Sequence, residues 1–208
     1  MIVFHISTSS NNLSLPLQKT FHARGVIAII LLLANISLIF ARKELFYMKE
    51  AARHKILFVC LGNICRSPAA HGVMEHFVEQ RGLQHLIEVD SAGTYGGHAG
   101  ELPDYRMRNA AANRGYRLTH RARRFQEEDY HRFDMIVVMD DMNYENVSRM
   151  APERKYLNKL HRFVEFCRNH PDRTYVPDPY YEGREGFELV LDMLEDGCQG
   201  LIEQLEQK

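Results

Sequence analysis

A cysteine and an arginine six positions apart are the residues best suited to chemistry in this chain. Cys60 is the first residue of the segment 60–67 and Arg66 is the last but one. The segment follows the apolar run 56–59 and precedes Pro68. This order predicts a strand, a tight loop and a helix. A loop that enters a helix N-terminus points backbone N–H groups at one spot and favours an anion there. We therefore expect a reactive Cys60 thiolate, with the planar guanidinium of Arg66 holding two phosphate oxygens.

The rest of this loop is expected to surround the phosphate. It comprises Leu61, Gly62, Asn63, Ile64, Cys65 and Ser67. Cys65 has a further interpretation, because an exposed thiolate oxidises first to sulfenic acid and a second thiol nearby can trap it as a disulfide. The alternatives are that Cys65 is a small buried apolar residue and that Cys60 is a structural cysteine at the end of a core strand. The Gly62-Asn63 pair and the Ser67-Pro68 step favour the phosphate loop.

A second segment, Val-Pro-Asp-Pro-Tyr-Tyr at 176–181, supplies a carboxylate. Two prolines fix the backbone on either side of Asp178, so the loop that presents it is stiff. The alternative is a solvated turn, since these residue types favour turns. Phosphoryl transfer to sulfur needs a proton for the leaving oxygen and then a base that activates water. Beside a thiolate–arginine loop, Asp178 is expected to fill both roles.

The elements that must position these residues alternate between strands and helices. We expect strands at 55–59, 87–91 and 135–139, and helices at 67–80, 104–113, 143–150 and 187–205, while 156–167 fits either a strand or a helix. This alternation predicts an α/β fold: a doubly wound, mostly four-stranded parallel sheet with helices on both faces. Ligands bind such sheets at the carboxyl ends of the strands, where Cys60 lies. The glycine-rich stretch 93–100 has no helix start after it and does not resemble a phosphate loop.

Composition narrows the function classes. The net charge of −1 gives no electrostatic case for nucleic acid binding. The eleven histidines are scattered without metal-ligand spacing, so we expect no metal site and no cofactor. A catalytic thiol needs a reducing compartment, which predicts a cytoplasmic catalytic domain.

The first 49 residues differ from residues 50–208, which we expect to form the catalytic domain. They include an apolar segment at 26–41, shorter than the roughly 20 residues of a typical membrane span. It is either a membrane anchor, a signal peptide or surface helix, or untranslated sequence upstream of a true start at Met48. If it is an anchor, the basic residues after it keep the catalytic domain in the cytoplasm.

Residues 54–206 resemble the low-molecular-weight protein tyrosine phosphatase family. The two defining motifs are VCLGNICRSP at the nucleophile loop and VPDPYY around Asp178. Intermediate pieces also match: VDSAGT at 89–94, PDYR at 103–106, HRAR at 120–123 and VMD at 138–140. One departure is Met142, which stands where the family usually has a serine, and it puts the hydrogen bonding after the third strand in question.

The resemblance implies hydrolysis of phosphotyrosine and aryl phosphates through a cysteinyl-phosphate intermediate. It makes Cys60 the nucleophile, Arg66 the phosphate clamp and Asp178 the acid and then the base. The partner would be a phosphotyrosine protein, such as a tyrosine kinase. Supporting roles fall to a larger set: Ser67 as a donor to the thiolate; Asn63, Ser91, His120 and Asp140 as supports of the loop; and Leu61, Tyr180 and Tyr181 as walls of a slot for the phenyl ring.

Two competing functions remain open at this point. Thioredoxin-coupled arsenate reductase begins with the same loop but needs two further cysteines on a mobile segment, and Cys167 and Cys198 are far apart in the sequence. A phosphotyrosine-binding module without turnover would not need nucleophile, clamp and acid together. Neither oligomeric state nor physiological substrate follows from the sequence.

Overall fold

The computed structural model describes residues 54–206 together with Leu33, Ile36, Leu38 and Ile39. The chain divides into two units, 1–50 and 51–208. The four described residues of the first unit are helical and exposed. Most of the segment 26–41 and Met48 lie outside the described residues, so the three interpretations of this region stay predictions. Among the described residues, no helix combines the length and the apolar character needed to cross a membrane.

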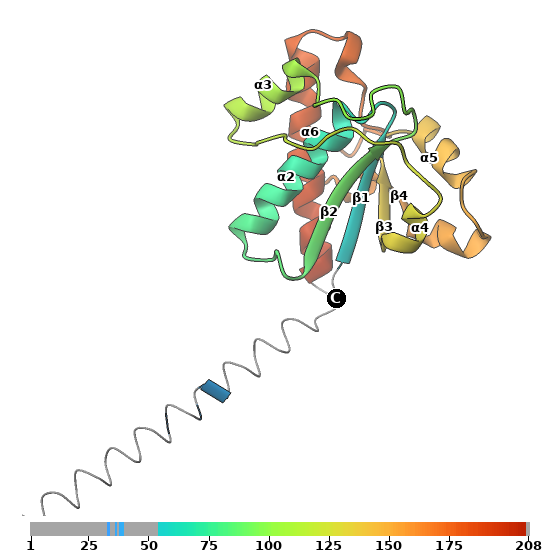
Figure 1. Cartoon of the computed structure of the whole chain (residues 1–208). Helices are drawn as coiled ribbons and strands as arrows, with labels where there is room; N and C mark the ends of the chain where they lie inside the picture. The colour runs from blue at the N-terminus through green and yellow to red at the C-terminus, as the bar shows by residue number, and fades with distance from the viewer. Residues whose placement is uncertain (1–32, 34–35, 37, 40–53, 207–208) are drawn as a thin grey trace, which may run out of the picture. The chain divides into compact units, whose positions relative to one another are not determined.

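A four-stranded parallel sheet forms the centre of the second unit (Figure 1). Its strands are β1 (His54–Cys60), β2 (Ile87–Gly93), β3 (Met135–Val138) and β4 (Leu160–Arg162), in the order β2-β1-β3-β4. All three pairings are parallel, and Cys60 at the end of β1 lies opposite Gly93 at the end of β2. The carboxyl ends of the strands therefore meet at one edge, where the loop after β1 begins.

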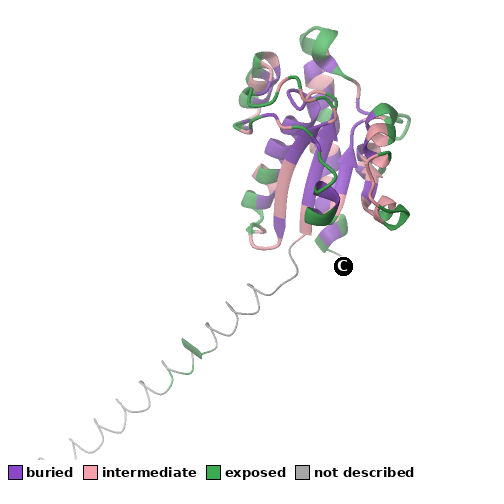
Figure 2. Cartoon of the chain, turned by 45° about the vertical axis from the view of Figure 1, so that its right-hand side comes forward, coloured by how far each residue is buried: buried purple, intermediate pink, exposed green. Residues whose placement is uncertain are grey.

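Helices cover both faces of the sheet, which confirms the predicted doubly wound fold. Three of them, α2 (Arg66–Gln80), α3 (Tyr105–Asn113) and α6 (Arg184–Glu206), lie on one side, and α4 (Asp129–Arg132) and α5 (Asp141–Ser148) lie on the other (Figure 1). Successive residues of β1 alternate between the two sides, because strand side chains point to opposite faces. Ile56 and Phe58 pack with α2 and α6, whereas Leu57 and Val59 pack in a second cluster that contains Tyr130 of α4. Strands β1 and β3 are buried over most of their length, whereas the middle of β2 is only partly buried (Figure 2).

The segment 156–167, which fitted either a strand or a helix, contains both kinds of structure. It forms 3₁₀ helices η1 (Arg154–Lys159) and η2 (Phe163–Phe166) around the three-residue strand β4. Only three residues pair with β3, so the apolar pattern is too short to identify a strand. Helix α4 was not predicted, because a four-residue helix leaves no periodic pattern. A last 3₁₀ turn, η3 (Pro179–Tyr181), follows Asp178.

Candidate active site

The nucleophile loop connects the end of β1 to the start of α2, as the sequence predicts. The Sγ atom of Cys60 accepts hydrogen bonds from the backbone N–H of Asn63 at 3.3 Å and from Ser67 Oγ at 3.1 Å. The side chain of Cys60 lines a cleft of about 240 Å³, although the residue as a whole is buried. Two hydrogen-bond donors are therefore aimed at the sulfur atom from within the loop.

Asn63 holds the loop in its shape through four side-chain hydrogen bonds. Its Nδ2 donates to Ser67 Oγ at 2.9 Å and to Ser91 Oγ at 3.0 Å. Its Oδ1 accepts from the backbone N–H of Arg123 at 2.9 Å and contacts Nε2 of His120 at 3.2 Å. The backbone at Asn63 is left-handed (φ 56°), the only such non-glycine residue among those described, and asparagine tolerates this region better than most residues.

Gly93 lets the end of β2 approach this loop closely. A Cβ atom at Gly93 would lie 2.7 Å from the carbonyl oxygen of Leu61 and 2.9 Å from the backbone nitrogen of Asn63. Both contacts are with backbone, which cannot move aside as a flexible side chain can. The loop that holds the nucleophile is thus packed directly against the neighbouring strand, and only glycine fits there.

Arg66 is buried at the start of α2 and pairs with two carboxylates. Its Nη1 donates to Asp140 Oδ2 at 2.6 Å and to the carbonyl of Val176 at 3.2 Å, and its Nη2 donates to Asp178 Oδ2 at 2.6 Å. Burial acts to lower the pKa of Arg66, but Cys60, Asp178 and Asp140 outweigh it, so that the pKa is raised and the guanidinium stays charged. The structure therefore brings the thiol of Cys60, the guanidinium of Arg66 and the carboxylate of Asp178 into one cluster.

The Asp178 loop is fixed to the sheet beside this cluster. Val176 N–H donates to the carbonyl of Met139, just after β3, at 2.8 Å. Asp178 Oδ1 caps η3 by accepting from the backbone N–H of Tyr180 at 3.2 Å, and Pro179 occupies the first position of that turn. Asp140 likewise caps α5, so it serves both as a helix cap and as a partner of Arg66.

The cleft above Cys60 has aromatic walls. Leu61, Tyr180 and Tyr181 line it as expected, and the rings of the two tyrosines meet edge to face at 5.0 Å. Tyr95 and His98 also line the cleft and were missed. Both lie in the glycine-rich stretch 93–100. Its position directly after β2, the neighbour of β1, is the signal that could have placed it at this edge.

The remaining thiols differ from Cys60 in their surroundings. Burial and then the nearby Cys60 thiol raise the pKa of Cys65, so Cys65 lines the cleft as a neutral thiol. Burial raises the pKa of Cys167 to about 12 and also raises that of Cys198, which lies fully buried within α6. Neither Cys167 nor Cys198 lines the cleft, and all four cysteines are free. The cysteine pattern of an arsenate reductase is therefore not assembled around Cys60.

His120 and Arg123 connect the Asn63 network to Asp90. Arg123 pairs with Asp90 at 2.9 Å and with Asp129 at 3.0 Å. Burial, followed by the neighbouring His71, lowers the pKa of His120, which favours its neutral form. The sequence gives no role to Arg123 beyond its place in the segment 120–123, and the structure shows that it joins two aspartates.

Met142 is largely exposed at the start of α5 and lines a shallow hollow next to Arg66 and Asp140. The next residue, Asn143, is buried, and its side-chain amide has no hydrogen-bond partner among the described residues. Its backbone N–H donates to Asp140 Oδ1 at 2.7 Å, so the helix cap is intact despite the methionine.

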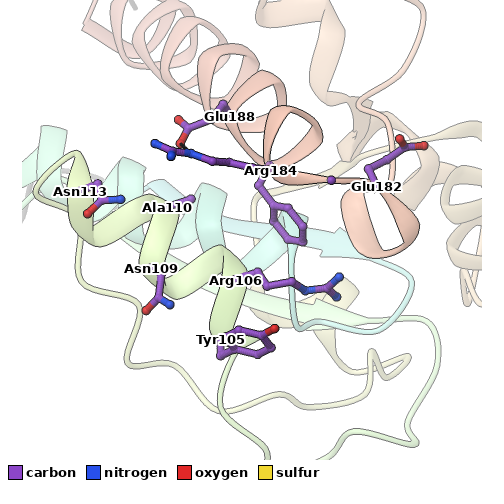
Figure 3. Close-up of a pocket in the computed structure, with 10 residues that line it drawn as sticks. Tyr105, Arg106, Asn109, Ala110, Asn113, Glu182, Arg184 and Glu188 are labelled. Atoms are coloured by element: carbon purple, nitrogen blue, oxygen red, sulfur yellow. Dashed lines mark ion pairs between the residues drawn. The ribbon is translucent and has the colours of Figure 1, made fainter.

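A second hollow, of about 360 Å³, lies between α3 and the start of α6 (Figure 3). Arg106 forms part of its wall, with its guanidinium 4.9 Å from the ring centre of Phe187 and 5.2 Å from that of Tyr180. The same guanidinium donates a hydrogen bond to each carboxylate oxygen of Asp104. This hydrogen bonding lowers the pKa of the Asp104 carboxyl. Arg106 thus supports the tyrosine wall of the active-site cleft from behind.

Comparison with known proteins agrees with this geometry. A family model described as low molecular weight phosphotyrosine protein phosphatase matches residues 55–208. A low molecular weight protein-tyrosine-phosphatase of Streptomyces coelicolor is 42% identical over 154 residues, covering 72% of this chain and 92% of the relative. A protein tyrosine phosphatase structure from Entamoeba histolytica aligns with a TM-score of 0.71 at 44% identity, over 74% of this chain and 97% of that one. A Drosophila arginine phosphatase aligns with a TM-score of 0.67 at 29% identity, over 73% and 97%. The chain belongs to the low molecular weight protein tyrosine phosphatase family and is a phosphotyrosine phosphatase.

Proposed function

We propose that Cys60, Arg66 and Asp178 hydrolyse phosphotyrosine in protein substrates through a cysteinyl-phosphate intermediate. The observation that carries this proposal is the cluster itself: the thiol, the guanidinium and the carboxylate line one cleft, and a 2.6 Å ion pair joins the last two. Because the catalytic thiol must stay reduced, we place the catalytic domain in the cytoplasm.

Substrate binding would begin with an exchange of anions at Arg66. A phosphate dianion offers the guanidinium two oxygens in the planar arrangement that it prefers. It would take over Nη2 from Asp178, while Asp140 and the Val176 carbonyl keep Nη1 in place. Asp178 would then lose its cation and face a second negative charge, which favours the protonated carboxyl that an acid catalyst needs.

The chemistry would follow in two steps. Cys60 Sγ attacks phosphorus, the bond to the tyrosine oxygen breaks, and Asp178 donates its proton to that oxygen. Asp178 then takes a proton from a water molecule as the water attacks the phosphocysteine, which releases inorganic phosphate and the thiolate. The hydrogen bonds from Ser67 Oγ and the Asn63 N–H stabilise sulfur as it leaves.

The walls of the cleft indicate an aromatic leaving group. Leu61 and the two tyrosines form flat apolar surfaces on which a phenyl ring can pack, and the ring contacts add to the binding energy of the phosphate. A phosphoserine would reach the thiol with a short side chain and leave these surfaces uncovered. Phosphoarginine is the competing substrate to be tested, because one structural neighbour is an arginine phosphatase.

The test compares initial rates on matched peptides that carry phosphotyrosine, phosphoserine or phosphoarginine, together with an autophosphorylated tyrosine kinase. Arsenate reduction with thioredoxin is measured in parallel. We expect turnover of the phosphotyrosine substrates and a phosphoenzyme that can be trapped by rapid quenching. Cys60→Ser should lose both while it still binds an aryl phosphonate, and the control Cys167→Ser should keep both. A phosphoenzyme that forms in Cys60→Ser, or faster turnover of phosphoarginine, would contradict the proposal.

A further inference from the structure

Two histidines and an aspartate from three parts of the fold converge next to the Asn63 network. His71 lies on α2, Asp90 on β2 and His120 in the segment after α3. One possible ligand atom from each of them lies within 4.8 Å of the other two. The three residues are far apart in the sequence, so no spacing motif reveals them. For that reason the sequence predicts no metal site.

The hydrogen bonds around His120 leave one of its ring nitrogens free. Asn63 Nδ2 donates to Ser67 and Ser91, so its Oδ1 must accept from His120, and Nε2 of His120 carries the proton. In the neutral ring, Nδ1 then presents a lone pair toward Asp90 Oδ1 at 3.6 Å. This distance is too long for a good hydrogen bond. It is close to the roughly 3.4 Å between two ligand atoms of a tetrahedral zinc ion with bonds of about 2.1 Å.

His71 shows the same pattern. Its Nε2 lies 3.1 Å from Glu75 Oε1, so the carboxylate fixes the proton on that nitrogen. Its Nδ1 is buried without a hydrogen-bond partner among the described residues, and the residue as a whole is only 8% exposed. The two imidazole rings lie 5.1 Å apart between centres. A histidine that donates one N–H to a carboxylate and leaves its other nitrogen free is the usual form of a metal ligand.

Asp90 keeps one oxygen available to such a metal. Oδ2 accepts two hydrogen bonds from Arg123, whereas Oδ1 accepts the backbone N–H of Ser91 at 2.7 Å and faces His120 with its remaining lone pair. Arg123 pairs with Asp129 as well as with Asp90. Two carboxylates against one guanidinium leave a net negative charge, which favours a bound cation.

We propose that His71 Nδ1, His120 Nδ1 and Asp90 Oδ1 form a zinc site whose fourth position is open to water. Two imidazoles and one carboxylate in a tetrahedral arrangement suit Zn²⁺, whereas Mg²⁺ and Ca²⁺ prefer oxygen ligands alone. Bound zinc would fix the tautomer of His120 that donates to Asn63. The site therefore stabilises the nucleophile loop from outside the cleft.

The test uses the untagged full chain in the Cys60→Ser background, which removes the reactive thiolate as a competing zinc ligand. Zn²⁺ binding is measured by competition with a chromophoric chelator, Co²⁺ binding by visible absorption, and stability by thermal unfolding with zinc or EDTA. A phosphine reductant replaces dithiothreitol, because thiols bind zinc. We expect one tight Zn²⁺ per chain, tetrahedral Co²⁺ bands and a higher unfolding temperature with zinc.

Two variants and a matched control identify the ligands. His71→Gln and Glu75→Gln should each weaken zinc binding at least tenfold, since loss of a ligand or of its supporting carboxylate has effects of this order. Glu75 is exposed, so its substitution leaves folding intact. His76→Gln, on the same helix, should bind zinc like the parent. Equal affinity of the His71→Gln and His76→Gln proteins, or no zinc binding once Cys60 is replaced, would overturn the proposal.

Discussion

Asn63→Ala removes all four hydrogen bonds that hold the nucleophile loop. At a net value of about 1 kcal/mol each, their loss lowers the free energy of unfolding by about 4 kcal/mol. Alanine at a left-handed position costs about 1 kcal/mol more than glycine, which adopts φ 56° without strain. The loss of about 4 kcal/mol is a large part of the stability of a typical domain, so Asn63→Ala is expected to be marginally folded.

Urea unfolding of three variants separates these contributions. Asn63→Gly loses the same hydrogen bonds without the backbone strain and should be about 1 kcal/mol more stable than Asn63→Ala. Asn109→Ala, an exposed asparagine of α3, is the control and should stay within about 0.5 kcal/mol of the parent.

Turnover of para-nitrophenyl phosphate and alkylation of Cys60 by iodoacetate across a pH series report the effect on the thiolate. Both should fall in Asn63→Gly under conditions where the protein is fully folded. An Asn63→Ala protein that loses less than about 1.5 kcal/mol and keeps normal turnover would refute the role assigned to this side chain.

Three further outcomes follow from the site and the chain. Asp178→Asn should slow turnover by about 10²–10⁴-fold, most for poor leaving groups, and a loss independent of leaving-group pKa would argue against acid catalysis. Peroxide inactivation should be reversible by dithiothreitol in the parent and less so in Cys65→Ser, whereas equal recovery would leave Cys65 as a packing residue. A form that begins at Met48 should be folded and fully active, since the four described strands all follow residue 53. Cell fractionation and the intact mass of the native protein check this start, and a membrane-bound species whose mass includes residues 1–47 would show an anchored form instead.

The sequence predicts most of the sheet, because β1 and β3 are built on apolar runs and β2 starts with alternating apolar and polar residues. It does not predict how residues 116–133 cover the sheet. Phe125, Tyr130 and Phe133 are buried there, but their spacing follows neither a helical nor a strand period. The fold class therefore follows from local patterns, while the cover of one face depends on long-range packing.

The site shows the same division. Cys60, Arg66 and Asp178 are recognisable because each lies in a short stretch with its own conformational signature. Tyr95 and His98 lie in a loop whose destination is set by the pairing of β1 with β2. The ion pairs of Arg66 join segments more than 70 positions apart, so no local pattern could show them.

The close approach of Gly93 to the nucleophile loop has a consequence for transplanting this chemistry. The loop cannot be moved to another protein as a strand–loop–helix piece alone, because its backbone rests against the end of a second strand. A recipient sheet would need a parallel neighbour that ends opposite the cysteine and carries no side chain at that point. A deletion or insertion of one residue within β2 would place Ala92 or Thr94 there and press a methyl group into the loop. The catalytic motif is thus eight residues long in sequence but two strands wide in space.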